Sequence, residues 1–349
     1  MRIGMQLDHR GGFLESVAEL RDLEKAGLGI VFVSELYSFD AVSQLGYIAA
    51  ATDRLEIASG ILQIYTRTPT LTAMTAAGLD YVSGGRFTLG LGVSGPQVIE
   101  GFHGVPYEAP LARTREVVEI CRKVWRRETL EHQGKYYRIP LGPEQGTGLG
   151  KPLKLVNRPV RERIPVMIAA TGPKNTALAA EIAEAWEPIF FYPERAKEVF
   201  GAALDEGRAR RDPALGELGI HVDAPAAIGT DVADALGAAR LRLAHYVGGM
   251  GARGRNFYFD LACRYGFAAE AARVQDLYLD GRRRDAAAAV PEALVRGVSL
   301  IGTPSEVAER VSAFAAAGVT TLSLSPMGRG ADSREGRLRL LEQVAALAG

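Results

Sequence analysis

Three glycines, Gly90, Gly92 and Gly95, stand in the spacing G-x-G-x-x-G inside the stretch GRFTLGLGVSG. This spacing is typical of the turn that holds a dinucleotide pyrophosphate, in which a helix opens within the motif and an acidic residue ends the next strand. Here Pro96 and an irregular stretch follow, and a helical pattern begins only near Leu111. The sequence therefore excludes a dinucleotide turn. Either the glycines let a flat ligand approach the backbone, or they form a tight corner of the fold.

Other polar side chains that could do chemistry stand where the predicted strands end. They are Gln6, His9, Glu35, Gln63, Ser94, Gln97, Thr171, Tyr192, Asp223 and Ser325. No lysine is among them to form a Schiff base, and the histidines are scattered rather than clustered with a carboxylate as metal ligands. The residues that follow Ser94 do not fit a nucleophile elbow. This set is thin for unaided acid–base chemistry, so we expect a bound cofactor to carry the reaction and predict no metal site.

The stretch Thr171-Gly172-Pro173-Lys174 is the best candidate for an anion site. A predicted strand gives way there directly to a helix with proline in its first turn. Free backbone N–H groups and the helix dipole would suit a phosphate, and Lys174 would add positive charge. An ordinary helix start has the same residues, so both interpretations stay open at this point.

Eight strand segments alternate with helical segments along the chain. The strands are predicted over residues 1–6, 30–34, 55–59, 87–91, 165–170, 186–191, 218–222 and 320–325. Apolar residues at helical spacing fill the intervals, with an N-cap at Thr68 and a capping box at Thr303 and Glu306. Two long interruptions, at about residues 129–163 and 248–297, are predicted to be insertions.

This alternation predicts an α/β fold, a (β/α)8 TIM barrel with insertions. The alternative is a doubly wound sheet with an appended domain. No change of composition separates two domains, so the whole chain, residues 1–349, is predicted to form a single barrel domain.

The composition limits the partners of the protein. Lys and Arg number 41 and Asp and Glu number 41, so no net charge favours nucleic acid or an anionic membrane. No stretch approaches the ~20 apolar residues of a membrane span, and the N-terminus lacks a basic and then apolar leader. We therefore expect a cytoplasmic protein that acts on a small-molecule substrate.

Several blocks of the sequence resemble one family, the luciferase-like oxidoreductases that use the deazaflavin coenzyme F420. The blocks are FVSELYSFDAVSQLGYIAAATDRLEIASGI, RTPTLTAMTAAGLDYVSGGRFTLGLGVSGPQVIEGFHGVPYEAPLARTRE, GTGLGKPLK, IPVMIAATGPKNTALAAEIAEAWEPIFF and GTPSEVAERVSAFAAAGVTTLSLSP. Methylenetetrahydromethanopterin reductase is one such relative, and the deazaflavin-dependent glucose-6-phosphate dehydrogenase is a more distant one. The resemblance implies a luciferase-like barrel, hydride transfer to or from the coenzyme, and a homodimer.

The same resemblance implies which residues bind the coenzyme. A non-proline cis peptide that supports the deazaflavin ring would fall between Gly60 and Ile61. Ser94 and Gly95 match the loop near the polar tail of the coenzyme. The full set of implied coenzyme-binding residues is Gly60, Ile61, Gln63, Ser94, Gly95, Thr171, Gly172, Pro173 and Lys174.

Glu35, His9 and Gln6 are the predicted catalytic residues. Glu35 stands where relatives place an acidic residue beside the coenzyme. Leu36 replaces the histidine of several dehydrogenases, and Gln6 replaces the glutamate of the pterin reductase, so neither of those activities is implied. Two alternatives remain open: a monooxygenase that uses FMN and oxygen, and a barrel that binds the coenzyme without turnover.

Overall fold

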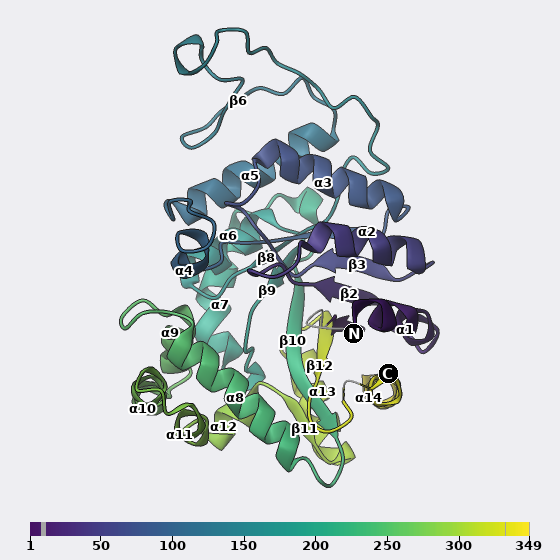
Figure 1. Cartoon of the computed structure of the whole chain (residues 1–349), viewed down its shortest axis with the longest axis vertical. Helices are drawn as coiled ribbons and strands as arrows, with labels where there is room; N and C mark the ends of the chain where they lie inside the picture. The colour runs from purple at the N-terminus through teal and green to yellow at the C-terminus, as the bar shows by residue number, and fades with distance from the viewer. Residues whose placement is uncertain (8–11, 332, 349) are drawn as a thin grey trace.

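The computed structural model describes residues 1–7, 12–331 and 333–348. Its centre is a closed barrel of eight parallel strands, in which the last strand pairs with the first (Figure 1). Around the barrel the strands follow in the order β1 (Arg2–Gln6), β2 (Ile30–Val33), β3 (Glu56–Ser59), β5 (Phe87–Gly92), β8 (Val166–Ala169), β9 (Ala185–Glu187), β10 (Gly219–Ile228) and β12 (Thr321–Pro326). The predicted TIM barrel is confirmed.

Helices follow the strands and cover the barrel. They are α1 (Phe13–Lys25), α2 (Ala41–Ala51), α3 (Pro69–Val82), α5 (Pro110–Trp125), α6 (Pro173–Ile182), α7 (Pro193–Ala209), α8 (Ala233–Gly249), α13 (Pro304–Ala316) and α14 (Arg334–Ala348). The predicted caps are present, because Thr68 accepts a hydrogen bond from the backbone N–H of Leu71, and Thr303 and Glu306 form a capping box. No helix in the described part of the chain is both long and apolar enough to span a membrane.

The two predicted insertions contain different elements. Residues 129–163 hold the short hairpin of β6 (His132–Gln133) and β7 (Arg138–Ile139) and the 3-10 turn η1 (Pro143–Gln145), and extend away from the barrel at the top of Figure 1. Residues 248–297 hold α9 (Phe257–Arg264), α10 (Ala268–Leu279), α11 (Arg283–Ala288) and α12 (Glu292–Gly297). Two further short strands, β4 (Leu62–Gln63) and β11 (Leu300–Gly302), pair with β5 and β10. The assignment of the whole chain to one domain stays a prediction.

Two apolar layers enclose the strands. Successive side chains of a strand point to opposite faces, here outward to the helices and inward to the barrel. The outer layer includes the fully buried Trp125 and Trp186. The inner layer is the small cluster of Ile30, Phe32, Ala58, Met167 and Ala185, with Ile61 packed against it. On each of these strands, the inward residue that follows the cluster residue in the direction of the chain therefore lies at or near the carboxyl end of the strand.

Three predicted boundaries differ from the structure. The strand expected over 186–191 ends at Glu187, because Pro188 has no N–H to donate to a neighbouring strand. The strand expected over 218–222 continues to Ile228 and takes in Asp223. The stretch after Gly95, expected to be irregular, begins with the one-turn helix α4 (Pro96–Ile99).

The glycines of the G-x-G-x-x-G stretch allow close packing between strands. A Cβ atom on Gly90 would lie 1.8 Å from the backbone oxygen of Ser59, and one on Gly92 would lie 2.7 Å from Cδ1 of Ile61. A larger residue at Gly90 would force β3 and β5 apart. Gly90 therefore fits the tight-corner explanation, whereas Gly92 lies at the open end of the barrel.

Candidate active site

A ring of eight residues surrounds the carboxyl end of the barrel, the end at which TIM-barrel enzymes bind their substrates. Each residue occupies an inward position at or near the carboxyl end of one strand or directly after it, except Asp223, which lies in the middle of the long strand β10. We call this set the mouth ring: Gln6, Ser34, Gly60, Gly92, Ala169, Glu187, Asp223 and Ser325. The ring divides into a half of small residues and a half of polar residues.

The small half comprises Gly60, Gly92 and Ala169, on three successive strands, with Ile61 beside them. The peptide bond between Gly60 and Ile61 is cis, as the resemblance implies. A Cβ atom on Gly92 would lie 3.6 Å from Cβ of Ala169. The side chain of Ile61 lies over Gly92, because a Cβ atom on Gly92 would be 2.7 Å from its Cδ1, so a flat ligand at these strand ends would meet Ile61 and the small residues beside it.

The polar half carries hydrogen-bonding groups that are already oriented. The amide nitrogen of Gln6 donates to Oγ of Ser34. Ser325 donates its hydroxyl to Oδ1 of Asp223 at 2.7 Å, and Arg242 from α8 donates to Oδ2 at 2.7 Å. Asp223 is thus a fixed carboxylate with a cation and a hydroxyl on its two oxygens.

Glu187 completes the polar half. It is the last residue of β9 and stands opposite Ala169 in the β8–β9 register. Burial, together with the nearby negative charge of Asp223, raises the pKa of the Glu187 carboxyl from 4.5 to about 8. Glu187 is absent from the residues predicted to lie at strand ends, because the predicted strand ran past it to residue 191. The proline directly after it was the available signal.

Glu35 lies outside the mouth ring. It follows the inward Ser34, and its side chain is buried with only 8% of the residue exposed. Arg67 donates to both of its carboxylate oxygens, at 2.5 and 2.8 Å, and the backbone N–H of Ala41 donates to one of them at 3.2 Å. Arg67 also pairs with Asp40 at 2.8 Å. The contacts join the end of β2 to the start of α2 and to the segment before α3.

The other predicted residues divide between the ring and its surroundings. Gln6, Gly60 and Ile61 lie at the mouth, whereas His9 is outside the described residues. Gln63 is buried, and its amide nitrogen donates to the backbone oxygens of Glu35 and Leu36 at 2.9 and 3.0 Å. Gln63 therefore holds the same segment as the Glu35–Arg67 pair.

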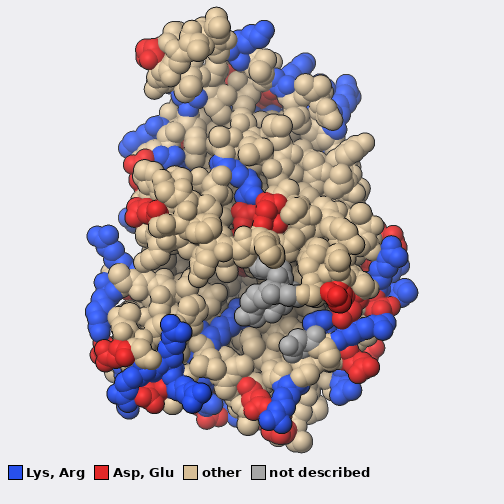
Figure 2. All heavy atoms as spheres, viewed as in Figure 1, with Lys and Arg blue, Asp and Glu red and all other residues tan. Residues whose placement is uncertain are grey.

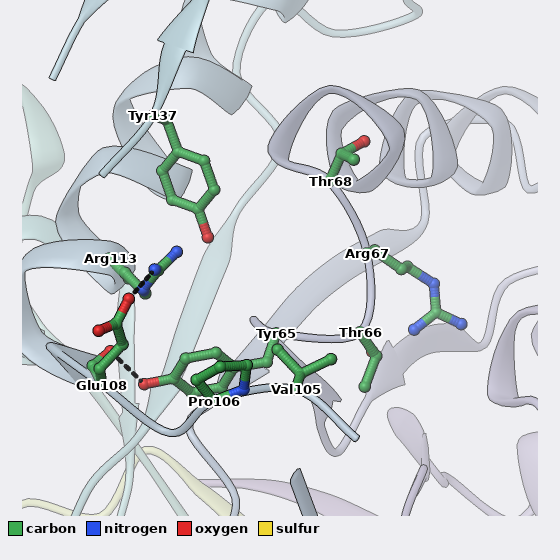
Figure 3. Close-up of a pocket in the computed structure, with 9 residues that line it drawn as sticks. All are labelled: Tyr65, Thr66, Arg67, Thr68, Val105, Pro106, Glu108, Arg113 and Tyr137. Carbon is green, nitrogen blue, oxygen red and sulfur yellow. Dashed lines mark hydrogen bonds and ion pairs between the residues drawn. The ribbon is translucent and has the colours of Figure 1, made fainter. Parts of the chain in front are cut away.

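Arg67 also lines a cavity of about 330 Å³, which lies on the side opposite to its guanidinium (Figure 3). It is lined by Tyr65, Thr66, Arg67, Thr68, Val105, Pro106, Glu108, Arg113 and Tyr137. In Figure 3 the guanidinium of Arg67 points away from Arg113, which lies below Tyr137 and pairs with Glu108 at 2.7 Å. The two cations that line this cavity are therefore already engaged by carboxylates.

The predicted anion site is at the start of α6. Gly172 is the N-cap residue, no side chain caps the helix, and no atom would lie within 4 Å of a Cβ at this position. Pro173 and Lys174 are exposed in the first turn. The free amides therefore open onto unfilled space, as an anion site requires.

Arg264 reaches the same site from α9, in the second insertion. Its Nη2 donates to the backbone oxygen of Thr171 at 2.6 Å, and its Nη1 is buried without a hydrogen-bond partner in the described part of the chain. Burial lowers the pKa of this guanidinium. A half-buried guanidinium with one unpartnered nitrogen next to a free helix N-terminus supports an anion at this place. No sequence pattern links Arg264 to Thr171.

Ser94 and Gly95 lie on the loop after β5. Ser94 has a left-handed backbone with φ of 55°, and its carbonyl accepts a hydrogen bond of 3.4 Å from the hydroxyl of Tyr107. Gly95 is the N-cap of α4. Their contact with a ligand stays a prediction.

Aromatic side chains stand near the polar half of the mouth ring. The rings of Phe190 and Tyr246 are 5.2 Å apart, and those of Tyr246 and Tyr258 are 4.8 Å apart. Burial raises the pKa of the Tyr246 hydroxyl, and Asp223 acts in the same direction. These residues form an apolar wall with neutral hydroxyl groups. No group of three or more potential metal ligands occurs among the described residues.

The sequence and the fold match known proteins. The family model for luciferase-like monooxygenases matches residues 1–321. An inferred coenzyme F420-dependent oxidoreductase of Mycobacterium tuberculosis is 41% identical over 330 residues, which cover 92% of this chain and 94% of that protein. The 5,10-methylenetetrahydromethanopterin reductase of Archaeoglobus fulgidus is 26% identical over 336 residues, 94% of each chain.

A solved structure shows the same fold. The coenzyme F420-dependent tetrahydromethanopterin reductase of Methanopyrus kandleri superimposes with a TM-score of 0.81 over 98% of this chain and 97% of that chain. The two sequences are 22% identical.

Proposed function

Because the chain belongs to the luciferase-like monooxygenase family, we propose that it is an oxidoreductase that uses coenzyme F420 to transfer a hydride to or from a small organic substrate. The observation that carries the proposal is the divided mouth ring, in which a half of small residues with Ile61 beside them would support a flat ring and a polar half lies next to it. The 41% identity to the mycobacterial protein favours F420 over FMN as the cofactor.

The residues present fit the coenzyme. Gly60 and Gly92 carry no side chains, so Ile61, which lies over Gly92, would form the surface that supports a planar ring system at the strand ends. The amides at Gly172 and the unpaired Nη1 of Arg264 offer donors to a phosphate. When bound, the coenzyme supplies or accepts the hydride.

We assign different roles to the predicted catalytic residues. Gln6 lies in the mouth ring, where its amide can orient a bound molecule. Glu35 is a positioning residue, because its carboxylate holds Arg67 and the start of α2. The catalytic role of His9 stays a prediction.

The aromatic wall supports a substrate with an apolar part. Phe190, Tyr246 and Tyr258 stand near the polar half of the ring, and Tyr37 and Phe102 add a second aromatic pair with centroids 6.1 Å apart. A non-catalytic binding barrel is the alternative. It would bind the coenzyme and reduce or oxidise no organic compound.

A titration with each cofactor tests the proposal. The full chain is expected to bind F420 with a dissociation constant in the low micromolar range, on the order of −8 kcal/mol, and FMN much more weakly. Coenzyme fluorescence measures both. Tighter binding of FMN would reverse the assignment and favour the monooxygenase.

We also propose that the protein is a homodimer. Large apolar side chains are exposed on the neighbouring helices α2 and α3. They are Tyr47, Leu71, Met74, Tyr81 and Val82. A face of this kind supports association between copies. Light scattering of the full chain measures the mass, and a monomer at micromolar concentration would contradict the proposal.

A further inference from the structure

Glu187 differs from the other carboxyl group of the mouth ring. Asp223 has Arg242 and Ser325 on its two oxygens. No cation or hydrogen-bond donor is in contact with the side chain of Glu187 in the part of the chain that the structure describes. A partly buried carboxyl group without a cation at the open end of a barrel is typical of catalytic sites more than of structural ones.

The position of Glu187 places it between the two halves of the ring. Ala185, two residues earlier, belongs to the inner cluster, so alternation along β9 directs Glu187 to the inside of the barrel. Its register partner Ala169 belongs to the small half, and Asp223 on the next strand belongs to the polar half. A molecule that lies on the small half and extends toward the polar half would pass this carboxyl group.

We propose that Glu187 is the residue that exchanges a proton with the substrate during hydride transfer. The proposal rests on the proposed function, and it names the acid–base residue of that site. In the reducing direction, the hydride brings two electrons to a carbon that is doubly bonded to oxygen or nitrogen. The heteroatom takes the proton as the O–H bond of Glu187 breaks, and solvent then returns a proton to the carboxylate. The oxidising direction reverses each step.

The groups that face Glu187 keep its proton in place near neutral pH. Burial has the larger effect on its pKa, and the negative charge of Asp223 adds to it. Arg242 is directed to Asp223, with which it forms an ion pair of 2.7 Å. His221 is buried on the same face of β10, and burial lowers its pKa to about 3, so it is neutral. Tyr246 is neutral as well. Glu187 thus faces a fixed negative charge and two neutral groups, and all of these favour its protonated form.

The first experiment measures the proton on Glu187 without coenzyme or substrate. Infrared difference spectra of the full chain between about pH 7 and about pH 9.5 are expected to show the loss of a protonated carboxyl C=O band. Glu187→Gln should lack this change. Glu198→Gln, which makes the same replacement on the exposed side of α7, is the matched control and should keep it.

The second experiment measures proton transfer. The full chain, loaded with reduced F420, is mixed with small ketones, aldehydes and imines as probes in a single turnover. Glu187→Gln should slow the reduction by about 10²–10⁴-fold. The dissociation constant for F420 should stay within about twofold of the wild-type value. Glu187→Asp should recover part of the rate.

The pH profile adds a readout that a structural role would not produce. The wild-type rate should fall as the pH rises through about 8, because the donor loses its proton. Asp223→Asn removes a negative charge and lowers the pKa of Glu187, so the fall should move to lower pH.

The outcomes separate this inference from the proposed function. An absent carboxyl band near pH 7, or a Glu187→Gln variant as fast as the wild type, overturns the role of Glu187. A wild type that binds F420 and reduces none of the probes overturns it too, while F420 binding stands. A wild type that fails to bind F420 overturns the proposed function and the proton-transfer role with it, although the infrared result still decides whether Glu187 holds a proton.

Discussion

Glu187 and Glu35 are two carboxyl groups near the same end of the barrel, and their neighbours give them opposite properties. Glu187 faces the inside of the barrel, has no cation in contact with it among the described residues, and has a pKa raised to about 8. Glu35 follows the inward Ser34 and meets the guanidinium of Arg67 on both oxygens. The direction in which each strand end turns its side chain therefore decides which group can exchange a proton.

Glu187→Gln is expected to change how stability depends on pH. The pKa of the wild-type carboxyl is about 8 in the folded chain against an ordinary value of 4.5. Between these values the unfolded chain ionises first, so wild-type stability falls as the pH rises and the loss is complete above about 8. The glutamine variant has no such loss. Denaturant unfolding should show it more stable than the wild type by more than about 1 kcal/mol at high pH, since one pKa unit corresponds to ~1.4 kcal/mol.

The control for this prediction is the same measurement near pH 4.5, the ordinary pKa of the group, where the difference between the two proteins should be smallest. A constant difference at all pH values would show that Glu187 is not ionised over this range.

The Glu35–Arg67 pair is expected to be structural. Its side chains are only 9% and 13% exposed, so Arg67→Met leaves a buried carboxylate without a cation and should destabilise the fold by about 3–5 kcal/mol. Glu35→Gln should lower the melting temperature as well, and the double variant should cost less than the two single changes together. Turnover should fall alike in both single variants. Loss of turnover in Glu35→Gln alone would restore the catalytic interpretation of Glu35.

The helix α6 is the element whose start we expect to bind the coenzyme phosphate. Gly172→Val should fold normally, because its backbone φ is −75° and the Cβ position is open. The added side chain would cover the amides and weaken F420 binding. Arg264→Met should weaken it about tenfold or more, since a hydrogen bond to a charged group contributes ~1.5–3 kcal/mol.

Fluorescence titration with F420 measures both variants. Arg273→Met, the same replacement at an exposed position on α10, is the matched control and should leave the affinity unchanged. Unchanged affinity in a folded Gly172→Val protein would place the phosphate elsewhere.

The elements themselves were predictable from the sequence to different degrees. Strand β2 has a clear local signal, an apolar run, and it was placed within a residue. The end of β9 was misplaced, because the apolar residues after Pro188 continue the hydrophobic pattern beyond the last paired residue. That error concealed Glu187.

Long-range contacts set the limit of prediction for the site. The glycine and proline at the start of α6 indicated an anion site, but the contact from Arg264 spans 93 residues and depends on how the second insertion packs. The pairing of Asp223 with Ser325 spans 102 residues. Local patterns predict the elements, and only tertiary packing decides which of their polar residues meet.

At the scale of the whole molecule, the two insertions differ in their relation to the mouth. Residues 129–163 extend away from the barrel (Figure 1). Residues 248–297 instead supply Arg264, which contacts Thr171 after β8, and Tyr258, which packs against Tyr246. Positive and negative side chains are intermingled on the face shown in Figure 2, with no patch of one sign. This distribution agrees with the balance of 41 basic and 41 acidic residues.

The pairing of β1 with β12 has a consequence for how the chain acquires its structure during synthesis. Arg2 stands opposite Thr321, and its guanidinium donates to the Thr321 hydroxyl at 3.2 Å across 319 residues of sequence. The edge of β1 therefore stays without its partner on the ribosome until the 319 residues that separate Arg2 from Thr321 have been synthesised. Contacts between such distant segments form slowly, and an open strand edge invites pairing with other chains in the meantime. Ring closure thus waits for the synthesis of β12, and during that interval a chaperone would have the most surface to protect.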